Sequence, residues 1–452
     1  MTCKNFAAIL AVATSLGMGS LGMGADTPPP PAAVDGTAPA APTVPTDYLN
    51  KRLPKWLRFR GEERMRLEGF EGGGFKTGND DTYLLNRIRF NMNVIPMPWL
   101  RFEFQVQDSR VWFKTLKPYA PPFQDTWDLR LAYVEFGGGE RPATLRFGRQ
   151  ELAFGDERLL GNTAWTNASR SFDAVRTTLR HGKYRVDLFA ASVVVLHDGD
   201  VGYHTAGNNL HGLYGGLDNV LPKSTLEPYV FWRLNQRQKT ETGGVGNLDF
   251  FTVGVRWVGK LPASFDYNIE MAKQTGSLGT DIISAWAGHW LVGRKIEHFA
   301  WKPRFIAEYN YATGDANGKD GHRNTFDQLY PTAHDKYGLA DQVGWKNIEH
   351  VRSGVELNPG TKWSLSGKYS SYWLANAHDA LYNTSSAVVA KVADGSGGRF
   401  VGQELDGSTL YKYSKQLQFG GGFSHIFPGR FLLKATPGGS YNSPYVMLVS
   451  SF

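Results

Sequence analysis

Apolar and polar side chains alternate along most of this chain, beginning near Lys55. In residues 57–68 every even position is Arg or Glu, and most odd positions are apolar. The same alternation returns in residues 84–94 and 100–107. A period of two is the side-chain repeat of a β-strand, in which successive residues point to opposite faces. These runs therefore predict strands with one charged face and one apolar face.

The runs are about 9–11 residues long, which is the length of a tilted membrane-spanning strand. Short turns such as residues 96–99 separate some runs, and long loops rich in Gly, Asn and Asp separate others, as in outer-membrane barrels. Less regular runs follow at 128–136, 143–150, 171–180, 184–195, 226–234, 250–257, 265–273, 301–310, 351–357, 362–369, 411–420 and 422–427. At about 22–25 residues per strand and connection, the chain predicts roughly 16–18 strands. The expected fold is all-β: a transmembrane antiparallel β-barrel in the outer membrane of a Gram-negative-type bacterium.

The arginines decide which face of these strands is wet. An Arg on the lipid side costs about 2–4 kcal/mol at the membrane midplane, so four of them would approach the stability of a whole domain. The charged face must therefore line a water-filled lumen. The arginines assigned to it are Arg58, Arg60, Arg64, Arg66, Arg87, Arg89 and Arg101. Glu63 falls on the apolar face, and the neighbouring Gly61 predicts a bulge that shifts the register there.

The two ends of the chain carry their own signals. Residues 1–25 have the charged, apolar and small-residue order of a cleavable signal peptide, with the cut expected near Ala25. Cys3 precedes the apolar run and is the only cysteine, so the mature chain has no thiol chemistry. Residues 26–54 are rich in Pro and Ala and predict a flexible leader before a barrel domain at 55–452.

The last residues alternate apolar side chains and end on Phe452, which resembles the assembly signal of bacterial outer-membrane proteins. Outer-membrane lipid and the barrel-assembly machinery are therefore expected partners. No uncharged apolar run long enough for a membrane helix follows the N-terminal segment, which excludes a helical membrane protein.

The net charge of +7 points to an acidic partner. Nucleic acid is not expected, because the arginines alternate along strands and no zinc spacing or helix-turn-helix pattern is present. The chain also lacks the G-x-S-x-G, H-E-x-x-H, Walker and Rossmann patterns, so neither catalysis nor a cofactor or metal site is expected. The segment from Asp315 to Asp320 lacks the Gly and Glu of an EF-hand, although a looser Ca²⁺ loop stays open there.

Five segments resemble the alginate-export type of outer-membrane channel. They are LRLAYVEFGGG (129–139), TLRFGRQELAFGDERLLGNTAWTNASRSFDAVR (144–176), EYNYATGDANG (308–318), TFDQLYPTAHDKYGLADQVGWKNI (325–348) and VGQELD (401–406). The resemblance covers most of 55–452 and keeps the family's order. It implies a monomeric barrel of 18 strands, whose lumen is narrowed by arginines with acids nearby and passes a polyuronate chain.

By this resemblance Arg130 and Arg149 correspond to pore-lining arginines, and Asp156 falls near an acidic position opposite them. The phrase GDERLLGNTAWTN is typical of the broader family rather than of its alginate-secreting members, which leaves the solute open. The expected function is passive passage of an anionic polysaccharide or oligosaccharide, with an uptake porin, either general or for small organic acids, as the alternative. A barrel-embedded enzyme or an adhesin is a third reading of a different class.

Overall fold

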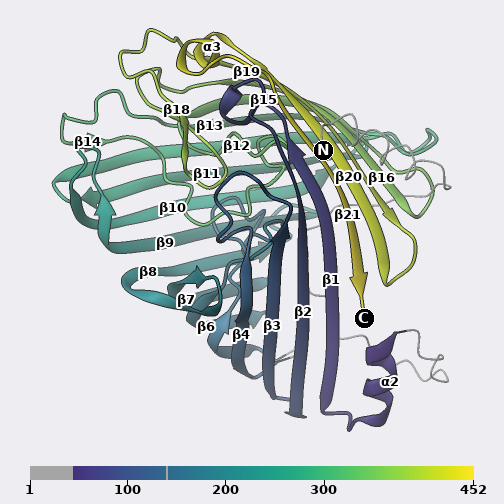
Figure 1. Ribbon diagram of the computed structural model, residues 1–452. Helices are drawn as coiled ribbons and strands as arrows, with labels where there is room; N and C mark the ends of the chain where they lie inside the picture. Colours follow the sequence, from purple (N-terminus) through teal and green to yellow (C-terminus); the bar gives the residue numbers. More distant parts are fainter. Residues whose placement is uncertain (1–43, 139–140) are drawn as a thin grey trace.

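The computed structural model describes residues 44–138 and 141–452. Eighteen antiparallel strands form the barrel wall, which closes on itself where the first strand pairs with the last (Figure 1). A two-residue strand, His322–Arg323, adds to the same sheet in parallel. The closing register runs from Glu62 opposite Ser451 to Glu68 opposite Tyr445. The predicted barrel of 18 strands is confirmed.

Each barrel strand pairs with its neighbours in chain order. The strands are β1 (Leu57–Phe70), β2 (Asp81–Met97), β3 (Leu100–Trp112), β4 (Asp125–Phe136), β5 (Ala143–Gln150), β6 (Phe172–His181), β7 (Tyr184–His197), β8 (Asp200–Asp218), β9 (Ser224–Lys239), β10 (Val245–Leu261), β11 (Phe265–Leu278), β12 (Asp281–Lys295), β13 (Arg304–Ala312), β15 (Ile348–Leu357), β16 (Trp363–Trp373), β19 (Phe400–Lys412), β20 (Leu417–Pro428) and β21 (Tyr441–Ser451). Within loops lie β14 (His322–Arg323), the hairpin of β17 (Leu381–Tyr382) and β18 (Val388–Ala390), the 3-10 turn η1 (Gly73–Phe75) and the helix α3 (Arg430–Ala435).

The two ends of the barrel differ. At one end, called here the turn end, connections such as 98–99, 182–183 and 413–416 are short. At the other, the loop end, longer connections include 113–124 and 151–171. The C-terminus and the helix α2 (Pro45–Arg52) lie at the turn end, whereas α3 lies at the loop end (Figure 1).

The wall has its apolar side chains outside and its charged side chains inside. Met65 on β1 and Ile88 on β2 are 40% and 43% exposed, whereas Arg64 and Arg87 on the same strands are 5% and 4% exposed. This distribution is the reverse of a soluble protein and is that of a membrane barrel. The parity argument from the arginines predicted these faces correctly.

Several strand boundaries were predicted wrongly. Residues 411–420 span the turn between β19 and β20, and 422–427 are part of β20 rather than a separate strand. β8 and β12 were missed, because β8 is rich in Gly and Asn and has register shifts, while β12 places small apolar residues on its inner face. The strands reach up to 19 residues, longer than the expected length of about 9–11 residues.

Gly61 does not form a bulge, since β1 and β2 pair without a shift from Leu57 to Phe70. Glu63 does lie on the outer face, where its carboxylate accepts a hydrogen bond from the Asn86 side chain at 3.0 Å. The structure gives Gly61 another role. A Cβ on Gly61 would lie 2.0 Å from the ring of Phe452, and the two backbones exchange hydrogen bonds. The glycine thus makes room for the C-terminal ring at the seam that closes the barrel.

Replacing Gly61 with Val is expected to expel the Phe452 ring and weaken this seam. We expect less folded barrel in outer-membrane fractions, measured by the heat-dependent mobility shift on electrophoresis. Gly407 is the control, because a Cβ there meets no atom within 4 Å. Equal losses for Gly61→Val and Gly407→Val would contradict the role given to the ring.

The end of the predicted flexible leader is ordered. Pro45 starts α2 at a position where its missing N–H costs nothing. The Asn50 side chain donates to the Phe59 carbonyl at 2.8 Å and accepts from the Phe59 N–H at 2.9 Å. It thereby caps the edge of β1 beyond the end of β21. The predicted signal peptide and residues 26–43 of the leader lie outside the described residues.

The described helices, α2 with 8 residues and α3 with 6, are too short to cross a bilayer.

Candidate functional site

Two long connections fold into the barrel from its loop end. These lumen loops are residues 151–171 and 324–347, and they meet in a parallel bridge between Leu160 and Tyr330. The Arg170 guanidinium donates to the Tyr330 carbonyl at 2.6 Å. Buried apolar side chains, among them Phe154 and Trp345, pack between the loops and the wall. Because the loops have their own apolar core, they form a fixed structure rather than loose chain.

A large cavity occupies the barrel between the lumen loops and the turn end. Its volume is about 2170 Å³. Sixteen Arg or Lys side chains and nine Asp or Glu side chains line it. The predicted residues among them are Arg58, Arg60, Arg64, Arg87, Arg89, Arg101, Arg130 and Asp156. The cavity is thus lined by a clear excess of cationic groups.

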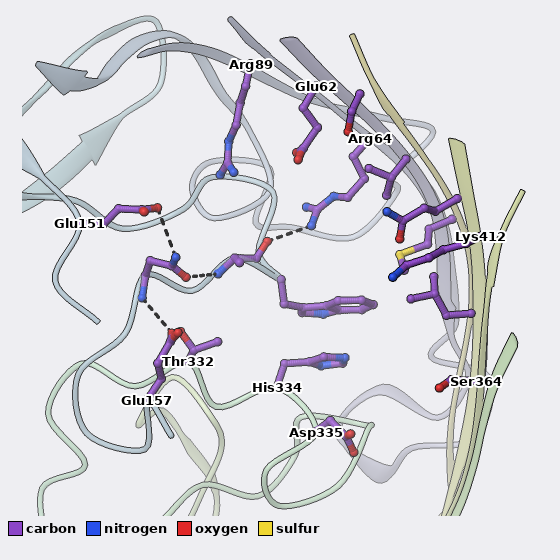
Figure 2. A pocket seen from close by; sticks show the side chains of 18 of the residues that line it. Glu62, Arg64, Arg89, Glu151, Glu157, Thr332, His334, Asp335, Ser364 and Lys412 are labelled. Atoms are coloured by element: carbon purple, nitrogen blue, oxygen red, sulfur yellow. Dashed lines mark hydrogen bonds between the residues drawn. The ribbon is translucent and has the colours of Figure 1, made fainter. Parts of the chain in front are cut away.

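Arginines of the wall hold the first lumen loop in place. Arg64 and Arg87 each donate to the Ala164 carbonyl at 2.9 Å, and Arg66 donates to the Trp165 carbonyl at 2.7 Å. Hydrogen bonds continue from Ala164 through Asn162 to Glu151, and Figure 2 shows Arg64 and Glu151 at the two ends of this chain. Arg87 and Arg66 also pair with Glu62 and Glu68, whereas the acceptors of the buried Arg64 guanidinium are loop carbonyls, those of Ala164 and Thr166.

Trp165 joins both lumen loops to the wall. The Arg66 guanidinium lies over one side of the indole, 3.7 Å from its centroid, and the His334 ring stacks on the indole at 3.7 Å with an interplanar angle of 2°. The His334 Nδ1 lies 2.9 Å from an Asp341 carboxylate oxygen. The indole ring is therefore held between two partners and acts as a clasp.

Several lining arginines are paired with carboxylates and brace the wall. Arg87 pairs with Glu62 at 2.6 Å. Arg101 pairs with Glu103, and Arg130 pairs with Glu151 and also donates to Gln105. In such pairs much of the guanidinium charge is compensated locally.

The acids on the lumen loops are paired in the same way. Asp156 lies 2.8 Å from Lys336 and 3.0 Å from Arg158. Burial alone would raise the pKa of Asp156, but Lys336 and Arg158 hold this pKa below its ordinary value. Burial likewise opposes ionisation of Asp335, whose pKa is lowered by Lys368 and Arg352. Both acids therefore stay charged at neutral pH and keep the adjacent cations in place.

Four cations at the turn end differ from these pairs. Arg60, Lys223, Lys260 and Lys412 line the cavity, and within residues 44–138 and 141–452 their side chains have no hydrogen-bond or ion-pair partner. The three lysines were not predicted, because each stands alone at a strand end or in a turn, where no alternation marks the inner face.

Two predicted lumen arginines do not line the cavity. Arg149 shares a face of β5 with Phe147, which is 60% exposed, so it points to the outer side of the wall. There it pairs with Asp173 at 2.9 Å, beside His204. This is a correction to its assignment by resemblance. Arg66 points inward but is covered by Trp165.

The segment left open as a loose Ca²⁺ loop is a turn. The Asp315 carboxylate accepts hydrogen bonds from the backbone of Asn317 and Asn324, both at 2.7 Å. In the described part of the chain, no group of three or more His, Cys, Asp or Glu is arranged to hold a metal ion.

Comparison with solved structures shows the same barrel elsewhere. OccD3 (OpdP) of Pseudomonas aeruginosa is similar with a TM-score of 0.56 at 12% identity, covering 88% of this chain and 91% of that one. The outer membrane protein opdK of P. aeruginosa gives 0.58 at 9%, covering 87% and 98%. OccAB2 of Acinetobacter baumannii gives 0.58 at 10%, with the same coverage. At these identities the likeness shows the fold.

No curated protein matches the chain. The family model described as alginate export matches residues 55–446, nearly the whole of the described barrel. Together with the barrel neighbours this places the protein in the bacterial outer membrane, where the short turns face the periplasm and the long loops the outside. The chain belongs to the alginate export family of outer-membrane channels.

Proposed function

We propose that the protein passes anionic solutes by passive diffusion, and that its main solute is an anionic polysaccharide or oligosaccharide of the polyuronate type. The observation that carries this is the charge of the cavity. Sixteen cationic and nine acidic side chains line it, and four of the cations, at the periplasmic mouth, have no partner in the part of the chain that the structure describes. An unpaired cation is free to accept a carboxylate from the solute. The proposal also rests on membership of the alginate export family.

The chemistry of the lining suits transport rather than tight binding. Guanidinium groups stay charged at any working pH and bind carboxylates in bidentate fashion. Many similar weak sites in sequence let an anion enter without stopping it. Arg60 and Lys412 would attract the solute at the mouth, and Arg89, which pairs with no carboxylate among the described residues, would meet it deeper in the cavity (Figure 2). Contact of the solute with Arg130, Arg101 or Arg58 stays a prediction.

A second candidate is uptake of small organic acids. The lumen loops and their buried apolar core occupy the loop-end part of the barrel, and this narrows the path for a polymer. One similar structure is that of P. aeruginosa OpdK with vanillate, itself a small aromatic acid. The same cationic lining would serve this solute. A monomeric state and assembly through the Phe452 strand remain predictions.

Current block in planar bilayers tests the proposal. Polyuronate oligomers added on the periplasmic side are expected to block at concentrations at least about a hundredfold lower than the monomeric uronate, because linked carboxylates bind several sites at once. A neutral oligosaccharide of the same length is the control. Block by small acids alone would favour the second candidate, and equal block by the neutral oligomer would overturn both.

A further inference from the structure

Four buried side chains near the loop end of β4 carry oxygen atoms that are without a hydrogen-bond partner in the described part of the chain. They are Asp125 with both Oδ atoms, Asp128 with Oδ2, Asn167 with Oδ1 and Ser171 with Oγ. Each of the four residues is at most 1% exposed. They are called here the buried oxygen cluster. Buried polar groups are nearly always paired, so several unpaired oxygens in one region need an explanation.

Two contacts bring Asp125 and Asn167 together. Ser109 on β3 is the cross-strand partner of Asp125, and its Oγ donates to the Asn167 carbonyl at 2.9 Å. The Asn167 side-chain amide donates to the carbonyl of Phe123, two residues before Asp125, at 2.9 Å. The amide nitrogen thus faces backbone carbonyls beside Asp125, and the oxygen of the same group is left without a donor.

A second set of contacts joins Asp128 and Ser171 through the β7–β8 hairpin. The Gly202 N–H donates to Asp128 Oδ1 at 2.9 Å, and the Val194 N–H donates to the Ser171 carbonyl at 3.3 Å. A Cβ placed on Gly202 would lie 3.1 Å from the Val194 side chain and 3.5 Å from Asp128 Oδ1, so these three residues are in contact. The cluster therefore lies where β4, the hairpin and the end of the first lumen loop meet.

The two carboxylates of the cluster have little cationic compensation among the described residues. In the described residues Asp125 forms no ion pair, and Asp128 has only Arg149 at 4.0 Å, a guanidinium already shared with Asp173. Two further acids act on Asp125 electrostatically: Asp198, and Asp108, which is itself paired with Arg110 at 2.7 Å. A buried carboxylate without a cation is strongly disfavoured.

We propose that the buried oxygen cluster binds a divalent cation, with Ca²⁺ as the ion that its donors suit best. All four residues offer oxygen, which hard cations prefer, and Ca²⁺ accepts six to eight such ligands from carboxylates, amides, hydroxyls and carbonyls. The site has only two carboxylates and completes its donor set with neutral oxygens, unlike clusters built from three or more acidic or imidazole groups. The cation would tie the end of the first lumen loop to β4 and to the hairpin, on the side of the barrel that faces the external medium.

Titration of the purified full chain in detergent tests this site. After treatment with a chelator, Ca²⁺ is expected to raise the unfolding temperature by about 2 °C or more, since a ligand that binds only the folded state stabilises it. Terbium, used as a luminescent substitute for Ca²⁺, is expected to bind with a stoichiometry near one and to be displaced by Ca²⁺. A response of neither kind in the unmodified protein would overturn the proposal.

Variants locate the response. Asp125→Asn and Asp128→Asn are each expected to abolish both the shift and the terbium signal. Asp200→Asn is the matched control. Among the described residues this exposed acid of the same hairpin accepts a side-chain hydrogen bond only from the Val201 N–H, so the variant should keep both responses. A response retained in Asp125→Asn would overturn the assignment. A second result would also overturn it: the parent shows no response to Ca²⁺, and Asp125→Asn is more stable than the parent. In that case the two carboxyl groups would share a proton instead of binding a cation.

Discussion

Replacing Arg60, Lys223, Lys260 and Lys412 together with glutamine is expected to lower the ratio of anion to cation permeability by about tenfold. Clefts lined by one sign of charge change the local ion concentration by factors of about 10 to 1,000, and four unpaired charges at a mouth lie at the lower end of that range. The variant removes most of the charge excess of the lining. Reversal potentials in a salt gradient across a planar bilayer measure the ratio.

A matched variant separates the local charge from the net charge. Lys76, Lys302, Lys319 and Lys391 are exposed and do not line the cavity, so the same four-fold replacement there should leave selectivity unchanged. Arg149→Gln should also have no effect, because its side chain lies on the outer face of the wall. Equal losses of anion selectivity in the two quadruple variants would show that the four cations at the mouth do not determine selectivity. The effect should also shrink at high ionic strength, where surface charges are screened.

Replacing Trp165 with Ala is expected to release the lumen loops and increase single-channel conductance. The substitution removes both the stack on His334 and the contact with Arg66. A stacked aromatic pair contributes roughly 0.5–1.5 kcal/mol beyond its buried area, and a desolvated cation–π contact about 2 kcal/mol. Together they favour the folded-in loop by more than tenfold, because 1.4 kcal/mol corresponds to a factor of ten. Larger and noisier open-channel currents should follow.

Trp286→Ala is the control for this clasp. Trp286 is 38% exposed on the outer side of β12, where it stacks on Tyr311, and its loss leaves the lumen loops unchanged. The Arg64→Gln variant, which loses its bonds to the Ala164 and Thr166 carbonyls, should shift conductance in the same direction as Trp165→Ala. If Trp165→Ala conducts like the parent, the clasp does not hold the loops.

The face of each strand could be predicted from the sequence because a charged side chain that faces lipid carries a large free-energy cost. Four arginines on one side of residues 57–68 leave only one arrangement that avoids charge in lipid. Arg149 was assigned to the lumen by resemblance and not by this reasoning. Arg149 shares a strand face with Leu145 and Phe147, which are 41% and 60% exposed, so the alternation itself indicates the outer side.

The strand boundaries and the loops that fill the lumen were harder to predict from the sequence. β12 carries Ala and Gly at positions where other strands carry charged groups, and this hides its alternation. The contacts of Arg64 and Arg66 with residues 164–166 join positions about a hundred residues apart, and the acceptors are backbone carbonyls that no side-chain pattern reveals. The positions of Lys260 and Lys412 at the mouth follow from the closure of the barrel, which the sequence pattern does not show.

The reversal potential of the unmodified protein in a KCl gradient tests the central claim most directly, because it reports the sign of the charge that permeating ions meet. The excess of cationic groups in the cavity predicts a reversal potential shifted from zero towards the equilibrium potential of chloride. This shift should decline as the salt concentration rises. A potential on the potassium side would contradict the account.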